Sequence, residues 1–147
     1  MDSLELIDRV RSGDRAALAR LVTAIESGEP GVSDAIAAMV GVSSPATRIG
    51  ITGPPGAGKS TLISAIINEL RSRSRSVAVL AVDPSSPITG GALLGDRIRM
   101  QDHVEDDGVY IRSMASRGHL GGLAVAAEPT IDVLSKAGFD YVLVETV

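Results

Sequence analysis

The sequence predicts an α/β protein built on an open, mostly parallel β-sheet, and three observations support this prediction. From Thr47 onward, short apolar segments with strand character alternate with amphipathic helical segments. The run Val77–Val82 is apolar without interruption, which is typical of a parallel strand covered on both faces. The residues before Thr47 show only helical spacing of apolar side chains. Strands and helices that alternate in this way favour parallel strands joined by right-handed crossovers.

The composition narrows the range of functions. Of the 147 residues, 44% are hydrophobic and 22% are charged, which is enough apolar surface for a packed core. Aromatic residues make up 2% and the formal net charge is −4, so base stacking and binding to a phosphate backbone are both disfavoured. The absence of cysteine excludes disulfides and thiolate metal sites. With no signal-peptide pattern and no apolar run that could span a bilayer, we expect a cytoplasmic protein without membrane insertion or a nucleic-acid partner.

Residues 1–46 are expected to form a small N-terminal helical extension that packs on the sheet. Apolar residues recur at helical spacing in two runs, over 4–10 and 17–25. Asp14 is expected to cap the second helix and Gly28 to end it. A third, shorter helix and a linker rich in Gly, Ser and Pro complete this part of the chain.

Residues 47–147 are expected to form the sheet domain. In chain order, the predicted elements are a strand at 48–52, a turn at 53–58, a helix at 59–72, strands at 77–82 and 109–112, a helix over about 122–137 and a strand at 140–145. Pro129 either kinks the last helix or marks its true start. The helix at 59–72 is expected to bury five side chains against the sheet: Leu62, Ile63, Ile66, Ile67 and Leu70. Since a sheet of this kind usually continues, we expect the front part of a longer protein, with a naturally short fold as the alternative.

One segment carries the strongest functional pattern. Residues 53–60 read G-P-P-G-A-G-K-S, which fits the phosphate-binding pattern G-x-x-x-x-G-K-[ST] between a strand and a helix. Its glycines allow consecutive backbone N–H groups to point at one anion. Lys59 is expected to bridge the β- and γ-phosphates and the Ser60 hydroxyl to ligate Mg²⁺. A glycine-rich turn without a ligand is the alternative, disfavoured by the rarity of a chance match. The residues expected to bind the nucleotide are Gly53, Pro54, Pro55, Gly56, Ala57, Gly58, Lys59, Ser60 and Thr61.

Three acidic residues are candidates for a magnesium site beside this loop, because Mg²⁺ takes hard oxygen ligands. Asp83 follows the apolar run 77–82 and either faces the metal or caps the turn at Pro84. Asp96 lies in a glycine-rich stretch and either approaches the γ-phosphate or caps a following helix. Glu145 ends an apolar strand, where a buried carboxylate is costly unless it is paired, so a functional role is favoured.

Several further segments together carry a family resemblance. They are V-D-P-S-S at 82–86, G-D-R-I-R-M at 95–100, I-R-S-M-A-S-R-G at 111–118 and V-E-T-V at 144–147. With the loop at 53–61, this ordered set resembles the MeaB/ArgK P-loop GTPases. These proteins are also described as methylmalonyl-CoA mutase-associated GTPases or as LAO/AO transport system ATPases or kinases. The resemblance covers nearly the whole chain from Ile49 onward.

The resemblance implies a P-loop NTPase fold of the SIMIBI class and membership of the metallochaperone GTPases. It implies GTP and Mg²⁺ as cofactors and a chaperone role that loads and protects the cofactor of a cobalamin-dependent acyl-CoA mutase, the adenosylcobalamin-dependent methylmalonyl-CoA mutase. It also implies a homodimer of the full-length protein. Carried over by position, Lys59 and Asp96 take catalytic roles, while Ser60, Asp83 and Glu145 bind or surround the metal.

Two departures limit what the resemblance implies. The guanine-reading N-K-x-D motif is absent from these residues, and so is the glycine that follows the E-T-V segment in the family. We therefore expect this part alone to bind nucleotide weakly and to hydrolyse little. A P-loop ATPase or kinase linked to amino-acid transport and a non-enzymatic scaffold switched by nucleotide are the alternatives.

The remaining polar residues have simpler interpretations. His103 and His119 stand apart from other metal-ligand residue types, so hydrogen-bonded or surface roles are favoured over catalysis. The arginines at 71, 73 and 75 are expected to form a solvated helix end. Arg112 and Arg117 are weaker candidates for a functional role, since Arg117 lies in a glycine-rich stretch that could reach phosphate or a partner.

Overall fold

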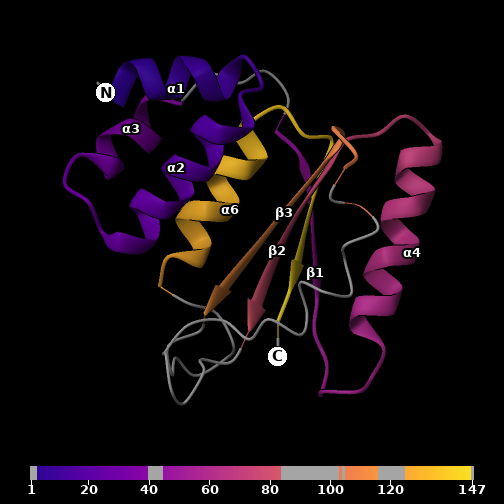
Figure 1. The fold of residues 1–147 in the computed structure, drawn as a ribbon. Helices are drawn as coiled ribbons and strands as arrows, with labels where there is room; N and C mark the ends of the chain where they lie inside the picture. Colours follow the sequence, from indigo (N-terminus) through magenta and orange to yellow (C-terminus); the bar gives the residue numbers. More distant parts are fainter. Residues whose placement is uncertain (1–2, 40–44, 84–102, 104, 116–124, 147) are drawn as a thin grey trace.

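The computed structural model describes residues 3–39, 45–83, 103, 105–115 and 125–146 (Figure 1). Its helices are α1 (Ser3–Arg11), α2 (Arg15–Ser27), α3 (Val32–Ala38), α4 (Lys59–Ser72) and α6 (Ala127–Lys136). Its strands are β1 (Thr47–Ile51), β2 (Val77–Asp83), β3 (Val109–Ala115) and β4 (Tyr141–Glu145).

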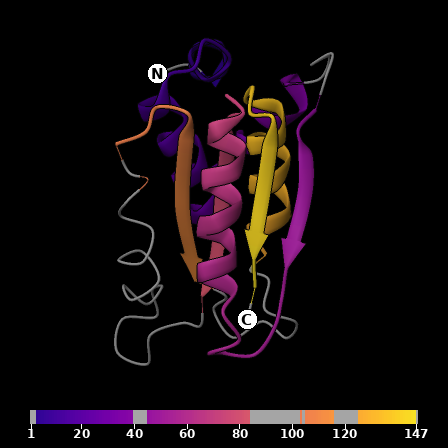
Figure 2. The same ribbon diagram turned by 90° about the vertical axis from the view of Figure 1, so that its right-hand side faces the viewer.

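The strands form one parallel sheet in the order β1-β4-β2-β3. Helix α4 covers one face of this sheet, and α6 with the N-terminal helices α1–α3 covers the other (Figures 1 and 2). This arrangement confirms the predicted open α/β fold. Because the strands are parallel, their carboxyl ends meet at one edge, where β1 leads into the loop before α4.

Two hydrophobic clusters hold the layers together, one on each face of the sheet. Toward the N-terminal helices, Leu80 and Val142 pack in a cluster that also contains Leu18 and Leu21 of α2. Toward α4, the second cluster is formed by Ile63, Ile67, Val77, Val79, Val109 and Leu143. Every residue of the run 77–82 is buried, because successive side chains alternate between these two cores. The expectation that the N-terminal helices pack on the sheet is therefore confirmed.

Local sequence signals account for several element ends. The Asp14 carboxylate accepts a hydrogen bond from the Ala17 backbone N–H (3.0 Å), and Gly28 ends α2 with a left-handed φ of 63°. These contacts confirm both predicted caps. Helix α6 begins at Ala127, so Pro129 lies in the first turn and marks the true start of the helix rather than a kink. Strand β3 runs three residues beyond its predicted end, to Ala115.

One predicted core position is wrong. Leu62 is 52% exposed, although its spacing on α4 places it beside the buried residues. The helix rests on the sheet through a narrow stripe centred on Ile63 and Ile67, both fully buried. Leu62 lies about 100° around the helix from Ile63 and falls at the side of this stripe, because an α-helix has ~3.6 residues per turn. In the parts of the chain that the structure describes, no element covers it.

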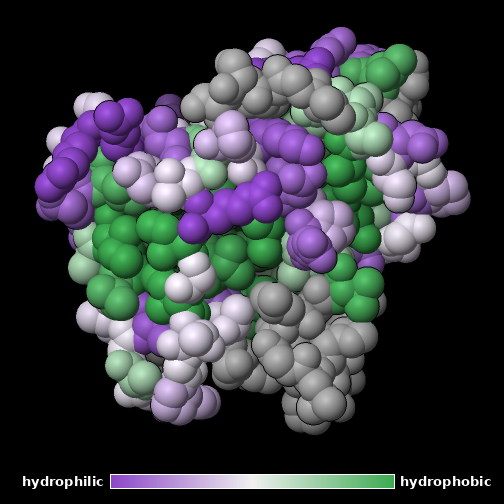
Figure 3. Space-filling model, turned by 180° about the vertical axis from the view of Figure 1, so that it is seen from behind, coloured by the Kyte–Doolittle hydropathy of each residue, from purple (hydrophilic) through white to green (hydrophobic). Residues whose placement is uncertain are grey.

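A hydrophobic surface is visible on the face of the molecule where β1 is nearest to the viewer (Figure 3). It extends over β1 and α4. Ile49, Ile51 and Ile66 are only partly buried there, and Leu62 is exposed. A single helix, α4, lies on this face of the sheet among the described elements, so the β1 flank of the face stays uncovered by them (Figure 2).

Charged and polar side chains connect α2 to β3. Among the described strands, β3 lies at an edge of the sheet. The Arg112 guanidinium of β3 forms an ion pair with Glu26 and donates to the Thr23 hydroxyl (3.1 Å). The side chains of Arg112 and Glu26 are 26% and 20% exposed. At the other end of α2, the Arg15 guanidinium lies 4.2 Å from the centroid of the Phe139 ring. Arg112 therefore has a structural role between α2 and the sheet.

Replacing Glu26 with Gln should lower the free energy of unfolding by about 1–3 kcal/mol, because it leaves the largely buried Arg112 guanidinium without its counter-charge. Urea denaturation measures this change. Glu29→Gln is the matched control, since Glu29 is exposed and should change the free energy by less than about 0.5 kcal/mol. Equal effects of the two substitutions would contradict a stabilising role for the Arg112–Glu26 pair.

Candidate functional site

The loop 53–58 connects β1 to α4 at the carboxyl edge of the sheet. Gly56 and Gly58 have φ values of 80° and 93°, which residues with a side chain rarely adopt. The Ala57 backbone N–H donates to the Pro54 carbonyl oxygen (3.2 Å) and closes a turn within the loop. Helix α4 then begins at Lys59, so its N-terminal N–H groups follow the loop directly. Backbone geometry thus favours glycine at position 58, which is a fixed position of the motif, and at position 56, which is a variable one.

The Lys59 ammonium group folds back over the loop that precedes it. Its Nζ donates to the carbonyl oxygens of Gly53 (2.7 Å) and Pro54 (3.1 Å). These two contacts hold a positive charge against the loop, on the same side chain that the motif assigns to the phosphates. Carbonyl oxygens are neutral acceptors, so a phosphate oxygen would be a stronger partner for the same ammonium group.

The Ser60 hydroxyl donates a hydrogen bond to Oε1 of Glu145 (3.1 Å). Both residues are buried, with exposed fractions of 8% and 6%. Their contact follows from the strand order, because β4 pairs directly with β1 and aligns Glu145 with Ile51, two residues before the loop. A hydroxyl that donates its proton to a carboxylate keeps oxygen lone pairs that can ligate a cation.

These donors fit a magnesium ion better than a metal held entirely by protein side chains. Within the described ranges, no group of three or more His, Cys, Asp or Glu side chains could hold a metal ion. Mg²⁺ commonly uses one or two carboxylates together with water and substrate phosphates. A buried hydroxyl and a carboxylate 3.1 Å apart, beside a phosphate-type loop, match that pattern.

The structure places the other predicted site residues to different extents. Asp83 is the last residue of β2 and pairs through its backbone with Ala115, at the edge that carries the loop. Thr61 is exposed on the first turn of α4, and residues 54–58 are exposed as well. Asp96, Arg117 and His119 lie outside the described residues. The residues brought together are therefore the loop, Lys59, Ser60 and Glu145.

Two contacts along α4 were not predicted from the sequence. His103 is buried, and its Nε2 lies 3.0 Å from the Ser64 hydroxyl, which agrees with the hydrogen-bonded interpretation of this histidine. Arg71 donates from Nε and from an Nη to the two carboxylate oxygens of Asp106, at 2.9 Å each. The expectation of a wholly solvated arginine cluster is therefore wrong for Arg71. Its partner is 35 residues away in the sequence, so local pattern could not identify it.

The neighbouring groups explain how Asp106 titrates. The Arg71 guanidinium, and after it the Gly108 backbone N–H, lower the pKa of Asp106 below its ordinary value of 3.8. Gly108 also leaves space for the guanidinium, because an added Cβ would lie 2.1 Å from Arg71 Cζ. The contact therefore depends on all three residues.

The effect of Asp106→Asn on stability should depend on pH. A carboxylate with a lowered folded-state pKa stabilises the fold above its unfolded value, and this contribution disappears as the pH falls through the folded value. The variant should therefore be less stable than the unmodified protein at neutral pH, and the difference should vanish well below pH 3.8. Urea denaturation over this pH range tests it. A difference that stays constant with pH would contradict the ion-pair explanation.

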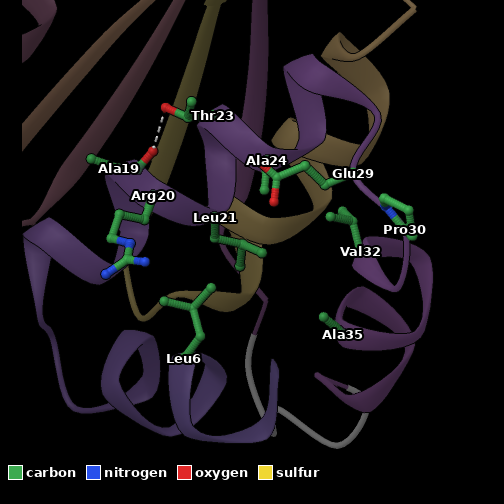
Figure 4. A pocket seen from close by; sticks show the side chains of 10 residues that line it. All are labelled: Leu6, Ala19, Arg20, Leu21, Thr23, Ala24, Glu29, Pro30, Val32 and Ala35. Carbon is green, nitrogen blue, oxygen red and sulfur yellow. Dashed lines mark hydrogen bonds between the residues drawn. The ribbon is translucent and has the colours of Figure 1, made fainter. Parts of the chain in front are cut away.

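A cavity of about 370 Å³ lies elsewhere, among α1, α2 and α3 (Figure 4). Leu6, Leu21 and Val32 are among its apolar lining residues, and Arg20 and Glu29 lie on opposite sides of it. None of the residues predicted to bind nucleotide lines this cavity. It is therefore separate from the loop site.

The parallel sheet and the loop with Lys59 and Ser60 at its end define the P-loop NTPase fold. A family model described as "Methylmalonyl Co-A mutase-associated GTPase MeaB" matches residues 18–147, and the chain belongs to this family. Among the described residues, no helix is long and apolar enough to cross a membrane.

Individual relatives agree with this assignment. A GTPase-family protein of Pyrococcus abyssi is 54% identical over 143 residues, which cover 97% of this chain and 44% of that protein. GTPase ArgK of Escherichia coli is 44% identical over 150 residues, with coverage of 97% and 44%. A crystal structure of an LAO/AO transport system kinase matches with a TM-score of 0.70 and 32% identity, covering 99% of this chain and 43% of that one. The chain thus spans less than half of the length of these proteins.

Proposed function

We propose that this chain is the nucleotide-binding part of a GTPase that serves as a chaperone for an adenosylcobalamin-dependent methylmalonyl-CoA mutase, supporting cofactor loading and protection. The observation that carries the proposal is the cluster of Lys59, Ser60 and Glu145 at the loop. The family description supplies the link to GTP and to the mutase. Because the matched relatives are more than twice as long, hydrolysis, dimerisation and partner binding are proposed for the whole protein.

In this proposal, the loop amides and the first turn of α4 bind the triphosphate. Lys59 exchanges its two carbonyl partners for oxygens of the β- and γ-phosphates. Ser60 ligates Mg²⁺ through its oxygen, and Glu145 orients this hydroxyl or binds the ion itself. The ion, when bound, neutralises charge that develops on the phosphates.

Two further carboxylates complete the proposed site. Asp83 ends β2 at the edge that carries the loop, and it is proposed to bind the metal or its waters. Asp96 is proposed to act near the γ-phosphate, as the family pattern implies. Hydrolysis requires a positioned water molecule and charge stabilisation rather than a side-chain nucleophile. The proposed site contains groups of the types that supply both.

Substituting Lys59 with Ala should weaken binding of Mg·GTP to the full-length protein by a factor of about 10 to 100, which corresponds to the loss of hydrogen bonds to charged groups. Isothermal titration calorimetry measures the affinity. Arg73→Ala is the matched control, because Arg73 is an exposed cation on the same side of the sheet that pairs with Glu69. Equal affinities for the unmodified protein and Lys59→Ala would refute the assigned role.

Turnover assays separate the proposed function from its alternatives. For a GTPase chaperone, we expect GTP hydrolysis by the full-length protein to be slow alone and faster with a cobalamin-dependent mutase. The name of the matched crystal structure favours a second candidate, a kinase, which would instead produce a phosphorylated acceptor. Binding without hydrolysis, with or without the mutase, would indicate a nucleotide-switched scaffold and contradict the GTPase proposal.

A further inference from the structure

Ser113 in β3 has a side-chain oxygen that lies buried in the protein. Among the described residues, this hydroxyl has no hydrogen-bond partner. Leaving such a group unsatisfied destabilises the folded protein, so buried hydroxyls are nearly always paired. An unpaired hydroxyl therefore calls for an explanation, and its position in the sheet supplies one.

Strand register places Ser113 in one row with Glu145. Ala81 of β2 is aligned with Glu145 on one side and with Ser113 on the other. Side chains in such a row point to the same face of a parallel sheet, and every second residue of a strand returns to that face. The two preceding rows, Tyr141–Val77–Val109 and Leu143–Val79–Ile111, belong to the cluster under α4. Ser113 and Glu145 therefore both face α4.

The chemistry of the rows changes at the edge that carries the loop. The first two rows are large and apolar, whereas the third reads Glu, Ala, Ser. In this row, Ala81 with its small methyl side chain stands between the two polar residues. Neighbouring strands are ~4.8 Å apart, so the backbones of Ser113 and Glu145 are separated by ~10 Å. Both side chains rise from the same face of the sheet, so a water molecule bound to the ion can lie above Ala81 and between them.

We propose that Ser113 is a positioning residue of the Mg–triphosphate site, whose hydroxyl hydrogen-bonds a water in the hydration shell of the ion held by Ser60 and Glu145. This inference rests on the proposed function and adds a group from a third strand, β3, to the site. A hydroxyl both donates and accepts hydrogen bonds, so it suits a water molecule in either orientation. Groups beyond the direct ligands commonly orient a metal site and tune its affinity.

The proposal has a signature that a structural serine would not produce. Ser113→Ala removes an unsatisfied hydroxyl, so the unliganded protein should be as stable as before or more stable. The same change removes one hydrogen bond from the loaded site, so the affinity for Mg·GTP should fall about 3- to 10-fold. A serine that only supports the fold would show the reverse pattern, with lower stability and unchanged affinity.

Two further variants complete the design. Thr130 of α6 also has a buried hydroxyl without a partner among the described residues, but α6 lies on the opposite face of the sheet from α4 (Figure 1). Thr130→Val should therefore keep or raise stability and leave the affinity for Mg·GTP unchanged. Ser113→Thr retains the hydroxyl on a residue that favours strands, and it should preserve most of the affinity.

The experiment uses the full-length protein, with calorimetric titration of GTP in the presence of Mg²⁺ and again in EDTA, and urea denaturation without nucleotide. We expect the loss for Ser113→Ala with Mg²⁺ present, and affinity equal to that of the unmodified protein in EDTA. If Ser113→Ala binds Mg·GTP as tightly as the unmodified protein while Lys59→Ala does not, this inference is wrong and the proposed function stands. If the unmodified protein does not bind Mg·GTP, both are wrong.

Discussion

The position of β4 between β1 and β2 is the constraint on which the candidate site depends. Val142 and Leu143 are fully buried on opposite faces of the sheet. Both faces of this strand are therefore packed, and a change of its register would disturb both clusters. Sliding the strand by one residue would exchange the two faces and turn Glu145 away from α4. The hydrophobic effect therefore fixes a polar contact, because burying Val142 and Leu143 in their own clusters also places Glu145 against Ser60.

The same constraint explains why a carboxylate is tolerated at the end of an apolar strand. An ionised carboxylate in a buried position is costly unless hydrogen bonds compensate for the lost water. The Ser60 hydroxyl provides one such bond, and it comes from the first turn of α4, where the positive end of the helix dipole also favours a negative charge. The positive end of the α4 dipole thus favours both an anion bound at the loop and the buried carboxylate of Glu145. A cation between them would separate two groups that otherwise repel each other.

Features set by local chemistry were predictable from the sequence, and features set by distant pairing were not. The bounds of α4, the Asp14 cap and the Gly28 stop follow from glycine conformation and side-chain capping, and all three are confirmed. The exposure of Leu62 depends on how many elements cover the α4 face of the sheet, and the spacing of apolar residues along a helix does not reveal this number. Contacts between groups such as Arg112 and Glu26, 86 residues apart, require the strand order. Glu145 lies between these two cases. Its position at the end of a strand indicated a functional role from the sequence, but its contact with Ser60 depends on the pairing of β1 with β4.

Helix α4 joins the candidate site to the rest of the α4 face. Ser60 and Ser64 are one turn apart, so their side chains lie on the same side of the helix. Ser60 binds Glu145 of β4, while Ser64 and Arg71 bind His103 and Asp106, which precede β3. Movement of α4 away from the sheet would break contacts at both ends of the helix and expose Ile63 and Ile67. The loop 53–58 and Lys59 are therefore attached to a helix that contacts the rest of the protein along its length. Rigid support of this kind lets a binding site hold its geometry before the ligand arrives.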